Sequence, residues 1–313
     1  MVLAANARGR ALRVPELITS RENRWLKQFR AALAGESQRG RGAADPETEI
    51  VGVEGPHLVE TALRAGLAVS AVLVSEAGAR HLAELGEWIA EPTRLLATSD
   101  RLFAQIASTE TPQGIAALVQ PPRACFDDLV RGGVPLVLIM AGVQDPGNVG
   151  ALLRAAEAFG ASGAAACAAG GIGTADPFGP KALRASAGSA LRLPILRGVG
   201  TPVLLTQLRM AGVRVYATSP GTCAGAALDA AGNAGSRGPF APWQVNWREP
   251  AALLVGNEGA GLPGDLVRSS DAVVSIPQIA ARESGVAMDS LNAAIAGAIL
   301  LYEAASQRGL GKA

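Results

Sequence analysis

The sequence predicts an α/β protein made of two successive domains. Short apolar runs alternate with amphipathic segments along most of the chain, which is typical of an α/β sandwich with a largely parallel sheet. Two adjacent prolines, Pro121 and Pro122, interrupt this alternation, because proline stops a strand. A chain of 313 residues, of which 49% are hydrophobic and 18% charged, is long enough for two domains with cores of their own.

The first predicted domain spans residues 1–120. We expect a helix over 18–33, because Leu, Trp and Phe recur there at helical spacing after Thr19 and Ser20, which are good N-cap residues. Residues 37–49 are expected to form a loop. Beyond this loop, strands are predicted over 50–55, 69–75, 94–99 and 114–120, and helices over 57–66, 80–90 and 100–109.

Residues 121–134 are the predicted linker, and residues 135–313 form the second domain. Strands are predicted here over 135–141, 163–168, 192–197, 213–218, 251–257 and 272–277, and helices over 148–160, 179–190, 201–211 and 290–306. Residues 221–243 are mostly small, so we expect them to form a flexible surface loop without a functional role.

The net charge of +1 conceals a basic arm at the N-terminus. Residues 1–41 carry nine Lys or Arg and three Glu, a net charge of +6, whereas residues 42–120 carry four Arg and eleven acidic residues, a net charge of −7. A basic arm on a near-neutral protein is a candidate contact for an anion or a nucleic acid. A solvated, frayed terminus explains the same charges equally well.

Several classes of protein and site are disfavoured by composition. The three cysteines are far apart and are expected to be reduced structural thiols of a cytosolic protein. Two histidines without a Cys/His cluster argue against a zinc site, and no metal is expected. No apolar run approaches the roughly 18–20 residues needed to cross a bilayer, and the N-terminus lacks the apolar region of a secretory signal. A cytoplasmic location is therefore expected.

Three turns marked by Gly or Asn follow predicted strands in the second domain, at 145–148, 256–263 and 276–292. Loops that follow the strands of a parallel sheet share one edge, where ligands bind. If the loops are neighbours, their polar side chains converge on one site. These side chains are Asn148, Arg154, Asn257, Glu258, Ser290 and Asn292.

Each of these side chains also has an ordinary structural explanation. Asn148 and Ser290 could each cap a helix, and Glu258 could lie on the surface of a turn. Arg154 could pair with Glu157 at i, i+3. Taken singly, such explanations are the better ones for most of the residues, but three such loops in one half of the chain favour a shared site.

Two other kinds of site are not expected. The segment GGIGT at 170–174 is a fragment of a dinucleotide-binding fingerprint, but it lacks the helix-opening third glycine and an acidic residue about 20 positions later. His57 and His81 lie in the first half, away from the three turns, and the chain contains no Gly-x-Ser-x-Gly sequence. A serine-hydrolase triad is therefore not expected.

Four stretches of the second half occur together in a known family. They are DPGNVGALLRAAEAFGA from 145, DPFGPKALRASAGSALRLPI from 176, LLVGNEGAGLP from 253, and SIP at 275–277 with DSLNAAIAGAILLYEA from 289. With these motifs the second half resembles the SpoU/TrmH branch of the SPOUT RNA methyltransferases. The first half resembles the family's small RNA-binding domain, which is similar to an RNA-binding ribosomal protein, through ITSRENRWLKQFRAAL, VEGPHLVETALRAG and TPQGIAAL.

The resemblance implies an enzyme and its architecture. The reaction is methyl transfer from S-adenosylmethionine to a ribose 2′-hydroxyl of structured RNA, with rRNA favoured over tRNA. The fold is a C-terminal SPOUT α/β domain with a deep trefoil knot that holds the cofactor, preceded by the RNA substrate-binding domain. The resemblance also implies a homodimer formed through the C-terminal domain.

The resemblance assigns the site residues by position. Those implied to bind the cofactor, largely through their backbone, are Gly256, Ile276 and Leu291, with Thr218 as a further candidate. Those that match the polar positions associated with catalysis and RNA binding are Asn148, Arg154, Glu258, Ser290 and Asn292. Residues 278–289 form a longer stretch than family members usually have at this place. We expect an extended loop there, carrying Arg282 and Glu283 over the pocket.

The chemistry fits these residue types. A sulfonium methyl group is already activated, so the enzyme mainly has to position a poor nucleophile and manage its proton. The family implies Arg154 as a general base, yet an arginine side chain is almost entirely protonated at pH 7. We interpret Arg154 as an electrostatic stabiliser and leave Glu258 or a water molecule as other candidates for the base.

Two alternative functions remain open. One is a catalytically silent RNA-binding protein that keeps the same scaffold, although the full set of polar site residues argues against it. The other is a methyltransferase of the same fold that acts on a base or on a substrate other than RNA.

Overall fold

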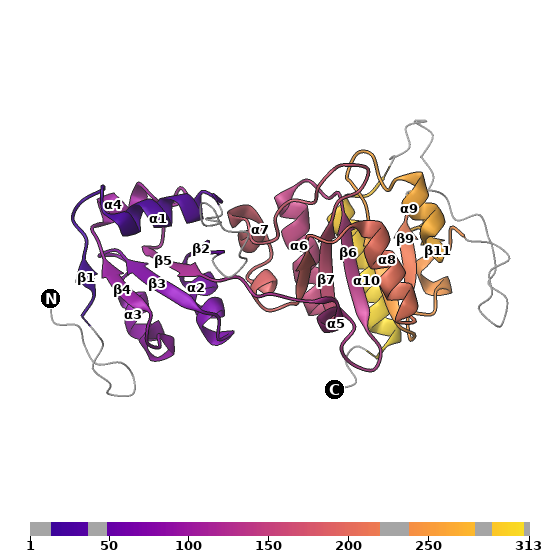
Figure 1. Cartoon of the computed structure of the whole chain (residues 1–313), viewed down its shortest axis with the longest axis horizontal. Coiled ribbons are helices and arrows are strands. Elements are labelled where there is room, and N and C mark those ends of the chain that lie inside the picture. The colour runs from indigo at the N-terminus through magenta and orange to yellow at the C-terminus, as the bar shows by residue number, and fades with distance from the viewer. Residues whose placement is uncertain (1–13, 37–48, 220–237, 279–289, 310–313) are drawn as a thin grey trace. The chain divides into compact units, whose positions relative to one another are not determined.

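The chain folds into two compact units in the computed structural model (Figure 1). The structure describes residues 14–36, 49–219, 238–278 and 290–309. The first unit comprises Met1–Pro122 and Phe178–Arg192, and the second unit comprises Arg123–Pro177 and Leu193–Ala313. Residues 1–13 and 37–41 of the predicted basic arm, residues 221–237 of the predicted loop at 221–243 and residues 279–289 of the predicted extended loop at 278–289 lie outside the described residues.

A five-stranded mixed sheet forms the centre of the first unit, in the order β1-β4-β3-β5-β2. The strands are β1 (Glu16–Leu17), β2 (Val51–Glu54), β3 (Val69–Val74), β4 (Arg94–Ala97) and β5 (Ile115–Val119). Strands β1, β4 and β3 are parallel, whereas β5 runs antiparallel to both β3 and β2. The prediction of a largely parallel sheet is wrong for this unit, because alternation of elements along the chain does not determine the direction of the inserted strand β5.

Helices cover both faces of this sheet, with α1 and α4 on one face and α2 and α3 on the other (Figure 1). They span Arg24–Leu33 (α1), Pro56–Arg64 (α2), Ala79–Leu85 (α3) and Asp100–Ala104 (α4). Helix α1 begins after Asn23, whose side chain accepts a hydrogen bond of 2.8 Å from the Trp25 amide. The predicted N-caps Thr19 and Ser20 lie before this cap. The predicted helix over 80–90 is interrupted at Gly86, where a short 3₁₀-helix η2 (Gly86–Trp88) follows α3.

The segment Phe178–Arg192 packs with the first unit, although the predicted boundary at 121–134 assigns it to the second domain. The single helix predicted over 179–190 is divided into α7 (Pro180–Ala185) and the 3₁₀-helix η3 (Ser189–Leu191). The two pieces are separated by Gly188, whose φ of +80° favours glycine. A Cβ atom at Gly188 would lie 2.9 Å from the Thr61 side chain, so glycine also permits the close approach to α2.

The second unit contains a six-stranded sheet in the order β11-β9-β10-β6-β7-β8. Its strands are β6 (Leu136–Ala141), β7 (Gly163–Cys167), β8 (Ile195–Arg197), β9 (Arg214–Thr218), β10 (Ala251–Val255) and β11 (Ala272–Val274). Every neighbouring pair is parallel, which confirms the predicted parallel sheet for this half of the chain. The central strands β6 and β10 are entirely buried, as their continuous apolar sequences require.

Helices also cover both faces of the second sheet, with α6 and α10 on one face and α8 and α9 on the other (Figure 1). They span α5 (Phe126–Leu129), α6 (Pro146–Ala158), α8 (Thr201–Met210), α9 (Gly264–Ser269) and α10 (Ala293–Gln307). Helix α5 lies inside the predicted linker, where Leu129 is fully buried in the core of the second unit. Helix α9 was not predicted. Among the helices of the described residues, none is both long and apolar enough to cross a bilayer.

The end of the predicted flexible loop at 221–243 belongs to the folded core. Phe240 is 1% exposed, and its amide donates a hydrogen bond of 2.8 Å to the carbonyl oxygen of Val273. The Ser275 amide in turn donates to the carbonyl oxygen of Phe240 at 2.9 Å. A short 3₁₀-helix, η4 (Pro242–Gln244), follows. The aromatic residue Phe240 after a run of small residues was therefore a signal that this end of the segment is packed.

Candidate active site

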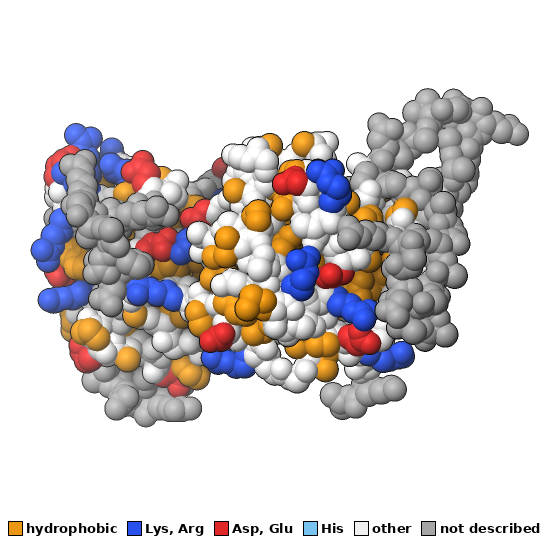
Figure 2. Space-filling model, turned by 45° about the vertical axis from the view of Figure 1, so that its right-hand side comes forward, with side chains coloured by type: hydrophobic (Ala, Val, Ile, Leu, Met, Phe, Trp, Pro, Cys, Tyr) orange, Lys and Arg blue, Asp and Glu red, His pale blue; other side chains and the backbone are white. Residues whose placement is uncertain are grey.

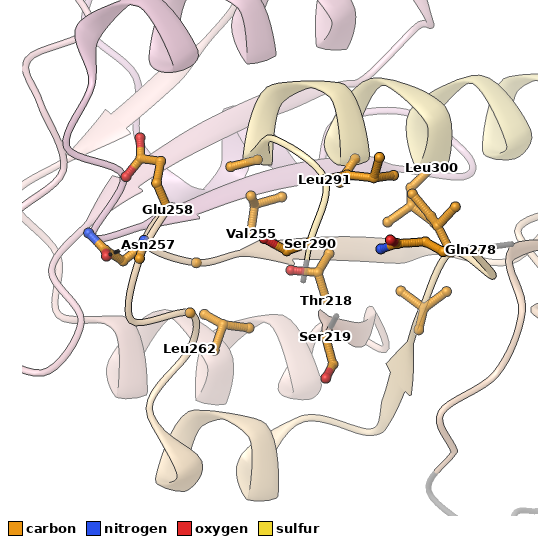
Figure 3. Close-up of a pocket in the computed structure, with 17 residues that line it drawn as sticks. Thr218, Ser219, Val255, Asn257, Glu258, Leu262, Gln278, Ser290, Leu291 and Leu300 are labelled. Carbon is orange, nitrogen blue, oxygen red and sulfur yellow. Dashed lines mark hydrogen bonds between the residues drawn. The ribbon is translucent and has the colours of Figure 1, made fainter. Parts of the chain in front are cut away.

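A pocket opens at the carboxyl ends of three neighbouring strands, β11, β9 and β10, beside the start of α10 (Figure 3). It encloses about 130 Å³, far more than the roughly 10–15 Å³ that one water molecule needs. Asn257 and Glu258 lie at one end of the row of labelled side chains, and Gln278 and Leu300 lie at the other (Figure 3). The edge of the sheet where the predicted loops were expected to meet is therefore where the pocket is found.

All four residues predicted to bind the cofactor line this pocket: Thr218, Gly256, Ile276 and Leu291. Thr218 ends β9, and its hydroxyl donates a hydrogen bond of 3.0 Å to the carbonyl oxygen of Leu254. This bond ties β9 to β10 and leaves the hydroxyl less available as a donor to a ligand. The apolar part of the lining includes Val255, Leu262, Val274, Ala293, Ala296 and Leu300.

Gly256 permits a close approach of two backbone segments at the pocket. A Cβ atom at this position would lie 2.7 Å from the carbonyl carbon of Gly261 and 2.8 Å from its oxygen. The loop folds back because Asn257 and Gly261 exchange two backbone hydrogen bonds of 3.0 and 3.1 Å. The Asn257 side chain holds the loop in place, since its Nδ2 donates to the carbonyl oxygen of Gly142 at 2.9 Å and its Oδ1 accepts from the amides of Gly259 and Ala260.

Glu258 connects this loop to the start of α6. Its carboxylate accepts hydrogen bonds from the backbone amides of Gln144 and Asp145, both at 3.1 Å, and from Nδ2 of Asn148 at 2.9 Å. Strands β10 and β6 are neighbours in the sheet, so the loops that follow them meet at this point. The start of a helix also favours a negative charge, because unpaired N–H groups point outward there.

The chain of side-chain hydrogen bonds continues to α10 and has a fixed direction. Asn292 is the N-cap of α10, and its Oδ1 accepts from the amides of Ala294 and Ile295. Its Nδ2 is therefore the donor toward Oδ1 of Asn148, at 3.0 Å. Asn148 must then direct its own Nδ2 to Glu258. Asn148 is 9% exposed, so both ends of its amide find partners in a site largely closed to water.

The electrostatics of this junction favour an ionised Glu258. Burial opposes ionisation, but the hydrogen bonds from Asn148, from the Gln144 and Asp145 amides and from its own backbone outweigh it and lower the pKa of Glu258. A carboxylate with a lowered pKa is a weak general base near neutral pH. The geometry therefore supports Glu258 as an acceptor that organises three loops, and it disfavours the predicted alternative of Glu258 as the base.

The predicted polar residues divide into three groups. Asn148, Glu258 and Asn292 form the hydrogen-bonded chain just described. Ser290 lines the pocket beside Leu291, and it does not cap α10, since Asn292 has that position. Arg154 lies two turns along α6 with an exposed side chain, outside both the pocket lining and the hydrogen-bonded chain.

One residue that builds this site, Asp145, was not predicted from the sequence. Asp145 is the N-cap of α6, and its side chain accepts from the Gly147 amide at 2.9 Å. The signal was present, because Asp followed by Pro is a typical helix start. Asn257 was recognised as a polar loop residue but not as the clamp between two loops. Within the described residues, no group of three or more His, Cys, Asp or Glu side chains is placed to hold a metal ion.

The lining of the pocket fits S-adenosylmethionine. Its walls are largely apolar, as an adenine ring requires, and the side chains of Thr218, Ser219, Gln278 and Ser290 add polar groups to the lining. The close packing at Gly256 shows that the backbone itself forms this wall. The described residues of the lining include no Lys or Arg that could neutralise phosphate groups. S-adenosylmethionine has no phosphate group, so it fits this lining better than a nucleoside triphosphate does.

Comparison with known proteins identifies both parts of the chain. Residues 135–302 match the SpoU rRNA Methylase family, and residues 46–117 match the MRM3-like substrate binding domain. The chain is 34% identical to the 23S rRNA (guanosine(2553)-2'-O)-methyltransferase RlmP of Bacillus subtilis (strain 168), over 80% of this chain and 86% of the relative. It is 30% identical to the 23S rRNA (uridine(2479)-2'-O)-methyltransferase of Streptomyces viridochromogenes, over 98% of both chains.

Solved structures agree with the sequence comparison. The AdoMet-bound rRNA methyltransferase from Sinorhizobium meliloti superposes with a TM-score of 0.72 at 28% sequence identity, covering 92% of this chain and 97% of that one. AviRb from Streptomyces viridochromogenes, solved in complex with AdoMet, gives a TM-score of 0.71 at 25% identity and covers 91% of this chain. These matches confirm the resemblance inferred from the four motifs, and the chain belongs to the SpoU rRNA Methylase family.

Proposed function

We propose that this protein transfers a methyl group from S-adenosylmethionine to a ribose 2′-hydroxyl of structured RNA, with rRNA as the substrate class. The prediction of an S-adenosylmethionine-dependent methyltransferase is confirmed by its family. The named relatives above act on 23S rRNA at a ribose 2′-oxygen, which favours rRNA over tRNA. One observation carries the proposal. Side-chain hydrogen bonds link the loop after β10, the start of α6 and the start of α10 beside one pocket.

The pocket residues hold the cofactor in this proposal. The backbone around Gly256, Ile276 and Leu291 surrounds the adenosyl group, with the apolar walls excluding water. The cofactor supplies an activated methyl group when it is bound. The protein contributes position, because a ribose hydroxyl is a poor nucleophile and its reaction depends on alignment with the methyl carbon.

The polar residues serve the RNA side of the site. Asn148, Glu258 and Asn292 hold the loops in register, and Ser290 offers its hydroxyl at the pocket. Arg154 is exposed on α6, which suits a contact with an RNA phosphate or with the charge that develops on the ribose oxygen. The pKa of Glu258 is lowered, so its carboxylate is a weak base. In this proposal the proton of the ribose 2′-hydroxyl is therefore accepted by a water molecule or by a group of the RNA.

The first unit binds the RNA in this proposal. Its match to a substrate binding domain over 46–117 supports this role. Helix α1 adds three exposed cations at a spacing of three residues, Arg24, Lys27 and Arg30, and Arg21 is exposed just before the helix begins. Figure 2 shows Lys and Arg side chains at the surface of the first unit. Such cations bind phosphates without regard to sequence.

Two features of architecture complete the proposal. The trefoil knot is supported by the family match and by the return of the chain after β11 to pack α10 against α6 and β10. A homodimer is supported by an exposed apolar stripe on α10, formed by Ile295, Ile299 and Tyr302, which are 54%, 39% and 52% exposed. Large apolar side chains aligned on one helix face mark a protein interface. A cytoplasmic location stays a prediction.

Calorimetric titration separates this proposal from a catalytically silent RNA-binding protein. We expect S-adenosylmethionine to bind one site per chain, with the heat of binding lost when the pocket is closed by a side chain at Gly256. Failure of the cofactor to bind, even with rRNA present, would leave only the silent scaffold.

A further inference from the structure

The pocket of the second unit has two chemically different ends. Figure 3 shows Asn257 and Glu258 at one end and Gln278 and Leu300 at the other. Glu258 is the one charged side chain among the described residues that line the pocket. It also binds Asn148, so its end belongs to the side of the site that faces the RNA in the proposed function. The two ends therefore suit different parts of a bound cofactor.

The end of the pocket at Gln278 has apolar, well-packed walls. Leu300 is 1% exposed, and Val274, in the strand that leads to Gln278, is 0% exposed. Both line the pocket. A flat heteroaromatic base fits such walls, whereas the charged groups of an amino acid would lose their hydration there. The adenine base of S-adenosylmethionine thus suits this end, and its positively charged sulfonium group suits the end at Glu258.

Gln278 places a polar group within this apolar end. The residue is exposed, and its side-chain amide points into the pocket (Figure 3). Asn257, whose side-chain amide also lies in the lining, binds backbone groups of the protein with both ends of that amide. The Thr218 hydroxyl likewise donates to a backbone carbonyl oxygen of β10. Gln278 is therefore the amide of the lining that is directed toward a ligand.

A glutamine amide matches the edge of an adenine base. The amide carries N–H donors and a carbonyl acceptor side by side. Adenine presents a donor, its N6 amino group, next to an acceptor nitrogen of the ring, and glutamine pairs with these two groups where proteins read adenine. The apolar walls fix the plane of the base, and the amide of Gln278 is suited to identify its edge.

We propose that Gln278 is a specificity-determining residue for the cofactor, and that its side-chain amide recognises the N6 edge of the adenine base of S-adenosylmethionine. The inference rests on the proposed function, because it requires the cofactor to occupy this pocket. Gly256, Ile276 and Leu291 surround the cofactor through their backbone, and Gln278 adds a side chain that distinguishes one base from another. A site that hydrogen-bonds an amino group rejects an analogue without that group.

Calorimetry with two ligands tests the inference. One ligand is S-adenosylhomocysteine, the product that remains after methyl transfer. The other is the same molecule with purine in place of adenine, so that it lacks only the N6 amino group. We expect the wild type to bind the adenine compound about tenfold more tightly than the purine compound, as for the loss of one hydrogen bond.

The variant Gln278→Met keeps the length of the side chain and removes the amide. We expect it to bind the two compounds about equally, with little change for the purine compound. Gln278→Glu keeps an acceptor for the N6 amino group and is expected to retain part of the preference. Gln113→Met, at an exposed glutamine of the first unit, is the control and should keep the full preference. Melting temperatures equal to that of the wild type are expected, because both glutamines are exposed.

A preference for the adenine compound in Gln278→Met equal to that of the wild type would overturn the inference, because the backbone alone would then read the base. Unchanged cofactor affinity together with a raised KM for rRNA would also overturn it, since the amide would then contact the RNA. If the wild type binds S-adenosylhomocysteine but transfers no methyl group to RNA, the proposed function fails and the calorimetric comparison still decides the inference. A wild type that binds neither compound contradicts both.

Discussion

At the scale of single residues, the role of Glu258 follows from the hydrogen bonds that its carboxylate accepts. Two backbone amides and the Asn148 side chain donate to its two oxygens. Asn292 donates to Asn148 from the other side, so the two asparagines each have a fixed orientation. A carboxylate held in this way is an anchor for the surrounding loops. The polar side chains of the candidate site are therefore held in place by the fold before any substrate binds.

Replacing Glu258 with Gln should destabilise the protein in a pH-dependent manner. The pKa of Glu258 in the folded protein lies below its ordinary value of 4.5, so its ionised form stabilises the fold above that pH, and this contribution is lost as the pH falls through the lowered pKa. We expect Glu258→Gln to melt a few degrees below the wild type at pH 7, and we expect this gap to narrow as the pH falls below 4.5. Melting curves between pH 3 and 8, with Glu36→Gln as a surface control, measure this. A gap that widens toward low pH would contradict the sign of the shift.

Arg154 should affect turnover and leave cofactor binding intact, because its exposed side chain lies outside the pocket lining. We expect Arg154→Ala to lower kcat by about 10²–10³-fold, as for loss of one group that stabilises developing charge. Arg154→Lys should restore little, because a lysine cannot reproduce a bidentate contact. Methyl-transfer rates with rRNA and calorimetry with S-adenosylmethionine measure the two effects. Near-normal turnover of Arg154→Lys would show that the guanidinium geometry is not required.

At the scale of elements, the site depends on loops that the parallel sheet brings together. Strand β9 lies between β11 and β10, and β10 lies between β9 and β6. Their carboxyl ends therefore share one edge of the sheet. The loop after β10 folds back tightly over Gly256, and this loop supplies both the pocket wall and Glu258.

A methyl group at Gly256 should close the cofactor site. The added Cβ atom would lie within 3 Å of the Gly261 backbone, which cannot move as a flexible side chain can. We expect Gly256→Ala to weaken S-adenosylmethionine binding at least about tenfold and to destabilise the second unit by about 1–3 kcal/mol, the usual cost of overpacking. Gly173→Ala is a control in another loop of the second unit, because its Cβ atom would meet no atom within 4 Å and Gly173 does not line the pocket. Equal binding by the two variants would show that this wall does not hold the cofactor.

Sequence patterns predicted the elements of the second unit better than those of the first. Continuous apolar runs such as 135–141 identified the buried parallel strands, and the loops that follow β6, β10 and β11 were expected at one edge. Strand direction in the first unit was not predictable, because the packing that places β5 between β2 and β3 leaves no trace in local periodicity. The same limit explains the segment Phe178–Arg192, whose place on the first unit depends on contacts of Gly188 and Arg184 with residues far away in sequence.

Within the site, residue types were predictable but their geometry was not. Asn148, Glu258 and Asn292 were recognised as polar residues on converging loops. Their order as donors and acceptors depends on three separate backbone segments, which no spacing rule relates. Arg154 shows the opposite case, because it was grouped with these polar residues, whereas the structure leaves it exposed on α6 and outside the pocket lining.

At the scale of the whole molecule, the chain passes between the two units three times, after Pro122, after Pro177 and after Arg192. The first unit thus holds a segment whose sequence matches the methylase family. A second whole-molecule feature is the apolar stripe on α10, where Tyr302 also makes an edge-to-face contact with Phe159 of α6, with ring centroids 5.6 Å apart.

The apolar stripe on α10 should form the dimer interface. We expect the wild type to sediment as a dimer at micromolar concentration and Ile295→Asp to sediment as a monomer, because a buried, unpaired carboxylate opposes association. Val203→Asp is the matched control, since Val203 is 55% exposed on α8, on the opposite face of the sheet. Sedimentation velocity measures the three proteins. A monomeric wild type, or a dimer that tolerates Ile295→Asp, would contradict this assignment.

The measurement that tests the central claim most directly is the chemical position of the transferred methyl group. Purified protein is incubated with S-adenosylmethionine carrying a labelled methyl group and an unmodified 23S rRNA transcript, and the RNA is then digested to nucleosides and analysed by mass spectrometry. We expect label on a single nucleoside, located on the ribose 2′-oxygen, and none with Gly256→Ala. Label on a base, or no label under conditions where S-adenosylmethionine binds, would contradict it.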